Sequence, residues 1–302
     1  MYRVISAALV TIALACNGHH DAPPPPPAQR DLTLISPGMP PLATLRYRVA
    51  KGTTTSLAMD VTTHLVAGDQ SDESPPVHVV IDLVVDDVLP DGKMKLTSTI
   101  RSLAATAASR NGSATNANGS GAEDPTQAHV DAVGSGVSGL AFTATMAPDG
   151  SVTDVKATDQ PLPELAKAEL DRIVASFTQL AMTLPDTPVG IGAKWRITRN
   201  LTLVSTLAVQ ATTTIDLLGV TRSSITYAVA SQLTGSAQTV VEDGTSVQID
   251  GIGGSVQGSG TLDLGTLATE SSQVAEQRMT MTTGSDRTPM EMTQTLRTST
   301  AH

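Results

Sequence analysis

The sequence predicts a mainly β protein: a curved antiparallel sheet or open barrel, packed on one central α-helix at about residues 163–184. Three observations support this. Apolar and polar residues alternate with a period of two along most of the chain after residue 45, as in strands with one buried and one wet face. Threonine, which suits the solvent face of a strand, is abundant. A single stretch has a clear helical period.

The strand pattern is clearest in five segments, at residues 57–65, 77–89, 93–103, 211–220 and 225–233. The turn sequence Pro-Asp-Gly occurs twice between strand-like runs, at 90–92 and 148–150. Pro presets the backbone for a turn, and Gly accepts the positive φ that turns require. We therefore expect hairpins and a meandering antiparallel order.

The helix is expected between Pro161-Leu162-Pro163 and Pro185. Within this stretch apolar residues recur every three or four positions, at Ala166, Leu170, Ile173, Phe177, Leu180 and Leu184. Such a stripe must be buried, and the sheet is the partner available to bury it.

Two other features concern the organisation of the β part. Val80-Ile81-Asp82-Leu83 resembles Thr214-Ile215-Asp216-Leu217, which suggests an internal duplication with two sheet halves flanking the helix. Residues 104–136 are rich in Ala, Ser and Gly and have no period. We expect a disordered loop there, with a binding loop as the alternative.

The N-terminus carries a secretion signal. A basic start at Arg3 precedes an uncharged, mostly apolar run that ends in Ala13-Leu14-Ala15-Cys16. Such a run is too short to span a bilayer, so it is typical of a cleaved signal peptide. These last four residues resemble the lipobox of bacterial lipoproteins, although Leu is usual at Ala13 and a small residue at Leu14. The resemblance implies that Cys16 is lipidated; the alternative is an incidental Cys behind ordinary cleavage.

The resulting organisation has three parts: a signal peptide at 1–15, a lipidated Cys and Pro-rich tether at 16–40, and one mostly-β domain at 41–302. The tether contains five consecutive prolines, Pro23 to Pro27, which favour an extended polyproline conformation. Asn17 follows the Cys, and by resemblance to Gram-negative sorting rules this implies the outer membrane.

The lipobox and tether occur together with a short motif after the expected helix, Leu184-Pro185 followed by Gly192 and Trp195. This combination resembles a group of uncharacterised bacterial outer-membrane lipoproteins, and the resemblance implies no activity. A curved sheet around a helix is also similar to envelope carriers of lipids and lipoproteins, as an analogy at the level of fold alone.

Composition argues against several classes of function. The chain has 29 acidic and 19 basic residues and 2% aromatics, so neither a basic stripe nor a stacking platform for nucleic acid is expected. His64 and His78 have the outward parity of their strands, and no Gly-x-Ser-x-Gly elbow is present. We expect no catalytic residues, no metal site and no cofactor.

One cluster could line a ligand cavity. Met279 and Met281 share one parity, as do Met290 and Met292, with a turn at 284–289 between them. Because Met adapts to varied apolar surfaces, this Met hairpin, with Phe177 and Trp195, would line an apolar cavity between sheet and helix. The alternative is that these residues fill the core of a chain poor in aromatics.

Together these features predict a membrane-anchored envelope lipoprotein with a non-catalytic, structural or protein-interaction role. A carrier or binder of a lipid or other apolar ligand is the main alternative, and an enzyme with an unrecognised site is the third. A carrier requires a cavity of at least about 300 Å³, whereas an interaction protein requires an exposed apolar patch.

Overall fold

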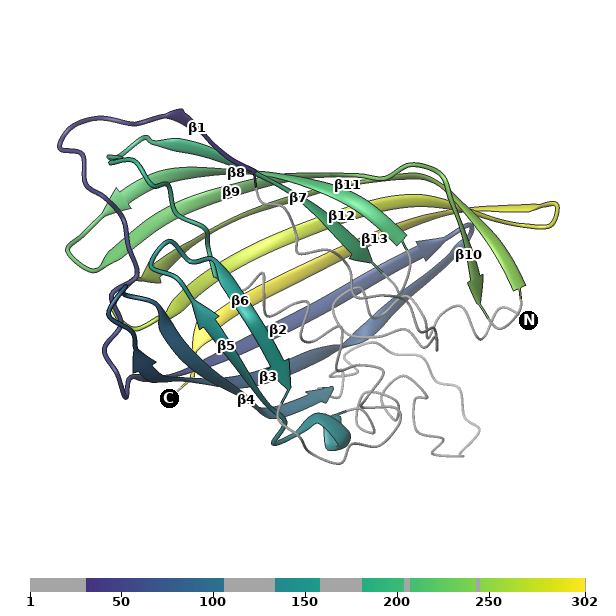
Figure 1. The fold of residues 1–302 in the computed structure, drawn as a ribbon. Coiled ribbons are helices and arrows are strands. Elements are labelled where there is room, and N and C mark those ends of the chain that lie inside the picture. Colours follow the sequence, from purple (N-terminus) through teal and green to yellow (C-terminus); the bar gives the residue numbers. More distant parts are fainter. Residues whose placement is uncertain (1–30, 106–133, 158–180, 204–206, 243–244, 302) are drawn as a thin grey trace, which may run out of the picture.

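The computed structural model describes residues 31–105, 134–157, 181–203, 207–242 and 245–301. The strands in this part of the chain form one antiparallel sheet, which curls into an open trough with its long strands running lengthwise (Figure 1). The prediction of a mainly β protein with a curved antiparallel sheet is confirmed. The strands are β1 (Asp31–Ser36), β2 (Thr54–Ala67), β3 (Gln70–Val88), β4 (Met94–Ala105), β5 (Ala141–Met146), β6 (Val152–Ala157), β7 (Lys194–Leu203), β8 (Leu207–Val220), β9 (Ser224–Thr234), β10 (Gln238–Glu242), β11 (Thr245–Asp263), β12 (Thr269–Thr283) and β13 (Asp286–Thr300).

Among the described strands, the sheet is not closed. Its order is β1-β7-β8-β9-β11-β12-β13-β2-β3-β4-β5-β6, with β10 paired beside β11. Most neighbours are consecutive hairpins, as the turn sequences predict. The exception at the centre is β13, which pairs with β2 (Thr298 opposite Met59), so the chain's last strand joins its two halves. The halves therefore lie side by side, and their proposed duplication stays a prediction.

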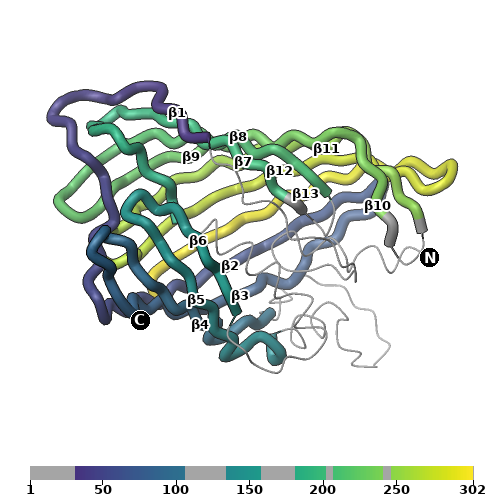
Figure 2. Tube along the Cα trace, viewed as in Figure 1, coloured from purple at the N-terminus to yellow at the C-terminus, as the bar shows by residue number. Residues whose placement is uncertain are grey.

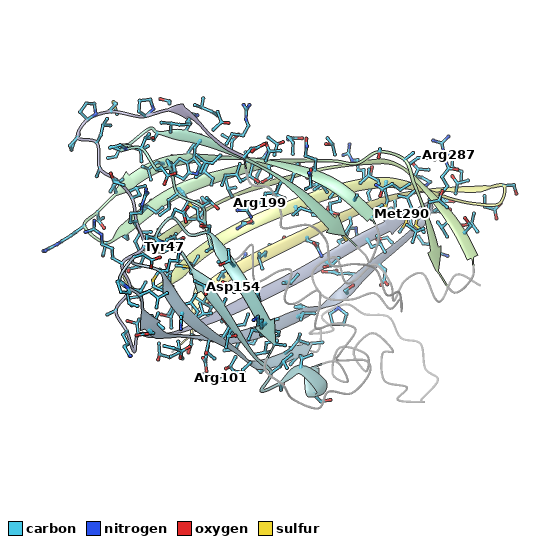
Figure 3. All side chains as sticks on the ribbon, in the orientation of Figure 1. Tyr47, Arg101, Asp154, Arg199, Arg287 and Met290 are labelled. Carbon is cyan, nitrogen blue, oxygen red and sulfur yellow. The ribbon has the colours of Figure 1, made fainter. Side chains whose placement is uncertain are left out.

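Apolar and polar residues alternate along the strands, so the apolar residues gather on one face of the sheet. This face is buried, and we call it the inner face. Two separate apolar clusters lie on it. In the first, Leu45, Tyr47 and Val49 cover one end of the trough, together with Leu184 and Val189. The second lies at the other end, and Figure 3 shows Tyr47 and Met290 at opposite ends with Arg199 between them.

The expected helix at 163–184 is not supported. Residues 163–180 lie outside the described residues, and residues 181–184 are not helical. Their polar backbone groups are used by tertiary partners instead: Leu184 N donates to Asp149 O at 2.8 Å, and the Tyr47 hydroxyl donates to Met182 O at 3.1 Å. Among the described residues, helix is confined to one turn at 134–137.

The boundaries of the tether and the loop also need correction. Residues 31–36, assigned to the tether by sequence, form the edge strand β1, in which Leu32 and Leu34 pack on the first cluster. Residues 104–105 belong to β4, and Val137, just past the expected loop 104–136, is fully buried. The sequence places these boundaries wrongly because a six-residue edge strand beside a Pro-rich run has too few alternations to detect.

The predicted turns are confirmed, with one change of length. Chain reversals at 90–92 and 148–150 connect β3 to β4 and β5 to β6. The turn of the Met hairpin is shorter than the expected 284–289, because Thr283 already pairs with Asp286. Pro289 is tolerated inside β13 because this end of the strand projects beyond β2, whose last pair is Ala67 with Met290. The projecting hairpin is the yellow tip in Figure 2.

Candidate functional site

Trp195 lies at the centre of the first cluster. It is fully buried on β7 opposite Ile215, and its indole N–H donates to Thr183 O at 3.0 Å. The ring therefore joins the 181–189 segment to the sheet, and its one polar atom is satisfied. A Trp buried in this way is a core residue.

The Met hairpin lies in the second cluster. Met279 is directly opposite Met290, and Met292 is buried with them against Leu65. Met281 packs on the same cluster and is partly buried. The four Met side chains therefore meet on one face, as expected from parity.

The structure does not bring the two ends of the expected lining together. Trp195 and the Met hairpin belong to different clusters at opposite ends of the trough. Phe177 and Cys16 lie outside the described residues. The described members of the expected lining thus pack into two cores rather than around one cavity.

Between the clusters the inner face is polar, which sequence reasoning missed. Gln294 Nε2 donates to Thr63 Oγ1 at 3.2 Å, and the hydroxyls of Thr213 and Ser231 lie 2.8 Å apart. Arg199 Nη2 donates to the Thr183 hydroxyl at 3.2 Å. The strand residues among them have the parity of the buried apolar positions, so parity could have located them. They mark a belt where the two apolar cores end.

An open depression of about 580 Å³ lies at the first end of the trough. Its lining is largely apolar and comes from the 46–50 segment and from the turns around Gly92 and Pro148; the lining residues are Arg46, Tyr47, Arg48, Val49, Ala50, Val88, Gly92, Met94 and Pro148. Burial raises the pKa of the Tyr47 hydroxyl far above its usual range, so this group stays neutral. The volume falls within the usual range for small-molecule sites.

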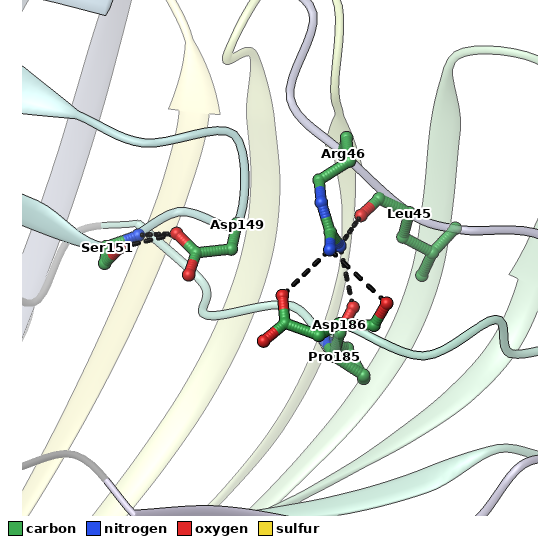
Figure 4. Close-up of polar contacts among 6 residues, drawn as sticks. All are labelled: Leu45, Arg46, Asp149, Ser151, Pro185 and Asp186. Carbon is green, nitrogen blue, oxygen red and sulfur yellow. Dashed lines mark hydrogen bonds and ion pairs between the residues drawn. The ribbon is translucent and has the colours of Figure 1, made fainter. Parts of the chain in front are cut away.

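One wall of this depression is fixed by Arg46 (Figure 4). Its Nη1 donates to the carbonyl oxygens of Leu45 and Pro185, at 2.7 Å each, and its Nη2 lies 2.8 Å from Asp186 Oδ1. The guanidinium thus ties the 45–50 segment to the 181–189 segment. Because these guanidinium donors bind groups of the protein itself, we assign Arg46 a structural role.

Both strand histidines lie on the outer face, as their parity predicts. His78 Nδ1 is 2.7 Å from Asp60 Oδ1, across the β2–β3 pair. His64 is opposite Glu73 in register. In the described part of the chain, no three His, Cys, Asp or Glu side chains come close enough to hold a metal ion. The described segments also include no helix long and apolar enough to span a membrane.

Exposed apolar side chains gather at one corner of the sheet. Of the seven large apolar residues that are exposed in the described residues, five lie on β1, on the loops 37–43 and 189–193, and at the end of β8. Backbone hydrogen bonds join these segments, from Met39 N to Ile191 O and from Gly192 N to Leu217 O. We call this surface the apolar corner; its residues are Ile35, Met39, Leu42, Ile191 and Leu218.

Comparison with known proteins identifies one family. Residues 91–266, more than half of the chain, match the model of a family of unknown function, DUF6263.

The chain belongs to this family.

Comparison with curated proteins gave no significant match.

The DUF6263 match covers the sheet from the turn before β4 to the end of β11. Trp195 lies within it, and so do Ile191 and Leu218 of the apolar corner. Residues 46–50 of the depression and the Met hairpin lie outside it. The sheet order nevertheless pairs β12 with β11 inside the matched region, so the matched and unmatched parts fold as one sheet.

Proposed function

We propose that this protein is a lipoprotein of the bacterial cell envelope, anchored by acyl chains on Cys16 to the outer membrane. The support is the sequence Ala13-Leu14-Ala15-Cys16 behind a basic, apolar signal segment. Lipidation with more than one chain gives stable attachment, whereas a single chain does not. Residues 17–30 would then link the anchor to β1.

The β domain acts, in this proposal, by surface contact and not by catalysis. The observation that carries this role is the apolar corner, because exposed apolar side chains that gather on one part of a folded protein's surface mark a contact site. Its loops are shaped by backbone hydrogen bonds between Ala43 and Val189 in both directions, at 2.9 Å. A contact surface of this kind suits a structural or interaction role in the envelope.

Mass spectrometry of the mature protein tests the anchor. The full chain, expressed in a Gram-negative host, should fractionate with the outer membrane and give an N-terminal peptide that begins at an acylated Cys16. The variant Cys16→Ser should leave the membrane fraction, while Asn17→Ser should stay in it. A mature N-terminus elsewhere, with an unmodified Cys16 thiol, would overturn the proposal.

A second function, binding of an apolar ligand, is favoured by the depression next to Tyr47. Its floor includes the buried side chains of Val49 and Met94, while Ala50 and Val88 lie at exposed positions on its wall. Native mass spectrometry of the purified protein should then show a bound lipid of defined mass. Filling the depression by Ala50→Phe should remove that mass, and Val274→Phe on the outer face should not. A clean apo mass for the unmodified chain would exclude this function.

A further inference from the structure

We propose that the apolar corner docks on the lipid bilayer surface to which the protein is anchored. This inference rests on the proposed anchor at Cys16 and names the surface that the domain turns toward the membrane. Four observations carry it: the position of the corner along the chain, the lack of charge in its loops, the pairing of two cations beside it, and the kind of side chain it exposes.

The corner lies within reach of the anchor. Residues 17–30 separate Cys16 from Asp31, the first residue of β1, and a chain of this length spans at most about 50 Å. Ile35 follows four residues later, about 13 Å along the strand. In chain order, the first large exposed apolar residues of the described domain are therefore those that follow the tether, on β1 and on the loop after it; Figure 1 shows β1 and this loop at its upper left.

The corner also lacks charged side chains of its own. No Asp, Glu, Lys or Arg occurs in residues 32–45 or in residues 187–193. Two of the cations that flank it are paired: Lys194 Nζ lies 2.9 Å from Asp216 Oδ2, and Arg46 pairs with Asp186. Paired charges are less costly to bring to a low-dielectric boundary than isolated ones.

The side chains suit hydrocarbon better than a protein partner. All five are aliphatic or thioether groups (Ile, Met or Leu), on the edge strand β1, on the two loops and near the end of β8. Protein hot spots are enriched in Trp, Tyr and Arg, whereas insertion of aliphatic side chains into the headgroup boundary depends on apolar area. Because the anchor holds the domain beside the bilayer, its effective concentration there is high and a weak contact suffices.

The test uses the full lipidated chain and a fluorophore on one introduced thiol. Acylation of Cys16 leaves no other thiol, because Cys16 is the only Cys. Ile191→Cys reports on the corner. Val274→Cys is the matched control, because Val274 is an exposed apolar residue of similar accessibility (41% against 47%) on the outer face of β12. Both labelled proteins are placed in phosphatidylethanolamine–phosphatidylcholine vesicles that contain lipids with nitroxide-labelled acyl chains.

Nitroxide lipids should quench the label at position 191 at least threefold more than the label at position 274. Substituting Met39→Ser and Leu218→Ser together should abolish the difference while the protein stays anchored. Equal, weak quenching at both positions with Cys16 acylated would overturn docking and leave the anchor intact. Shielding of position 191 from aqueous iodide without lipid quenching would assign the corner to a protein partner and also overturn docking. An unacylated Cys16 would remove the anchor and the docking proposal together.

Discussion

At the scale of single residues, the protein is held together by side chains that tie loops to the inner face. Tyr47 and Trp195 each donate a hydrogen bond to a backbone carbonyl of the 181–184 segment. Arg46 binds the carbonyl of Pro185 from the other side. Each bond satisfies a backbone group that would otherwise be buried without a partner. These residues are therefore structural, and their removal should change stability.

Stability at high pH should depend on Tyr47. Burial raises the pKa of its hydroxyl in the folded state, while an unfolded Tyr titrates near pH 10. Because the folded-state pKa is the higher of the two, the neutral Tyr47 hydroxyl contributes its full share of the folding stability below pH 10. That contribution is lost as pH rises above 10. Tyr47→Phe should lose about 1 kcal/mol at pH 8, because the Met182 carbonyl loses its donor. Urea unfolding at pH 8 and pH 11 should also show a smaller loss of stability with pH for Tyr47→Phe than for wild type. Equal losses would contradict the assignment.

A second prediction concerns a turn carboxylate. The Lys93 ammonium, 2.9 Å from Asp91 Oδ2, and the Lys93 backbone N–H lower the pKa of Asp91. Lys93→Ala should raise that pKa toward its ordinary value, as measured by NMR titration of the carboxyl carbon. Asp87 provides the internal control, because its pKa is lowered mainly by Lys51 and should not move. Since both groups are exposed, the stabilisation that is lost as pH falls should be small.

At the scale of elements, the strand β11 shows why glycine is needed inside a sheet. A Cβ on Gly258 would lie 2.5 Å from Ser272 O and 2.6 Å from Gln273 Cγ. The Gln273 side chain can lie across β11 because no Cβ is there. At Gly253 the nearest atom to such a Cβ is Leu233 O, at 3.9 Å. Gly258 and Gly253 lie on the same strand, but the surroundings of Gly253 leave room for a Cβ and those of Gly258 do not.

Substituting these two glycines should separate the effects. Gly258→Ala should destabilise the protein by about 1–3 kcal/mol, because the added methyl group forces neighbouring atoms to move. Gly253→Ala on the same strand should change the free energy of unfolding by less than about 0.5 kcal/mol. Equilibrium unfolding in urea measures both. Similar values for the two variants would show that β11 relaxes freely and would contradict the contact argument.

At the scale of the whole molecule, the pairing of β13 with β2 makes the sheet one unit. β13 has partners along both sides, β12 and β2, whereas the edge strand β1 pairs with β7 alone among the described strands. Loss of a central strand separates the two halves and exposes both apolar clusters. Loss of an edge strand exposes only the side chains that it covers.

Truncations should reveal this difference. A chain that ends at residue 283 lacks β13 and should show no cooperative unfolding transition. A chain that begins at residue 37 lacks β1 and should still unfold cooperatively, with a lower Tm, because Leu32 and Leu34 no longer pack on the first cluster. Circular dichroism during thermal unfolding distinguishes these outcomes. A cooperative transition in the chain that lacks β13 would mean that the halves fold independently.

The sequence by itself determined the class of the fold, the strands with clear alternation and several turns. Alternation at 57–65 and 77–89 and the turn at 90–92 depend on neighbours in the chain, so local pattern reveals them. The outward parity of His64 and His78 is decided in the same way. Only the tertiary structure showed that β13 lies between β12 and β2, that Trp195 and the Met hairpin belong to separate cores, and that the apolar corner forms. These features depend on contacts between residues far apart in sequence, such as Met39 with Ile191, whose pairing no local period encodes.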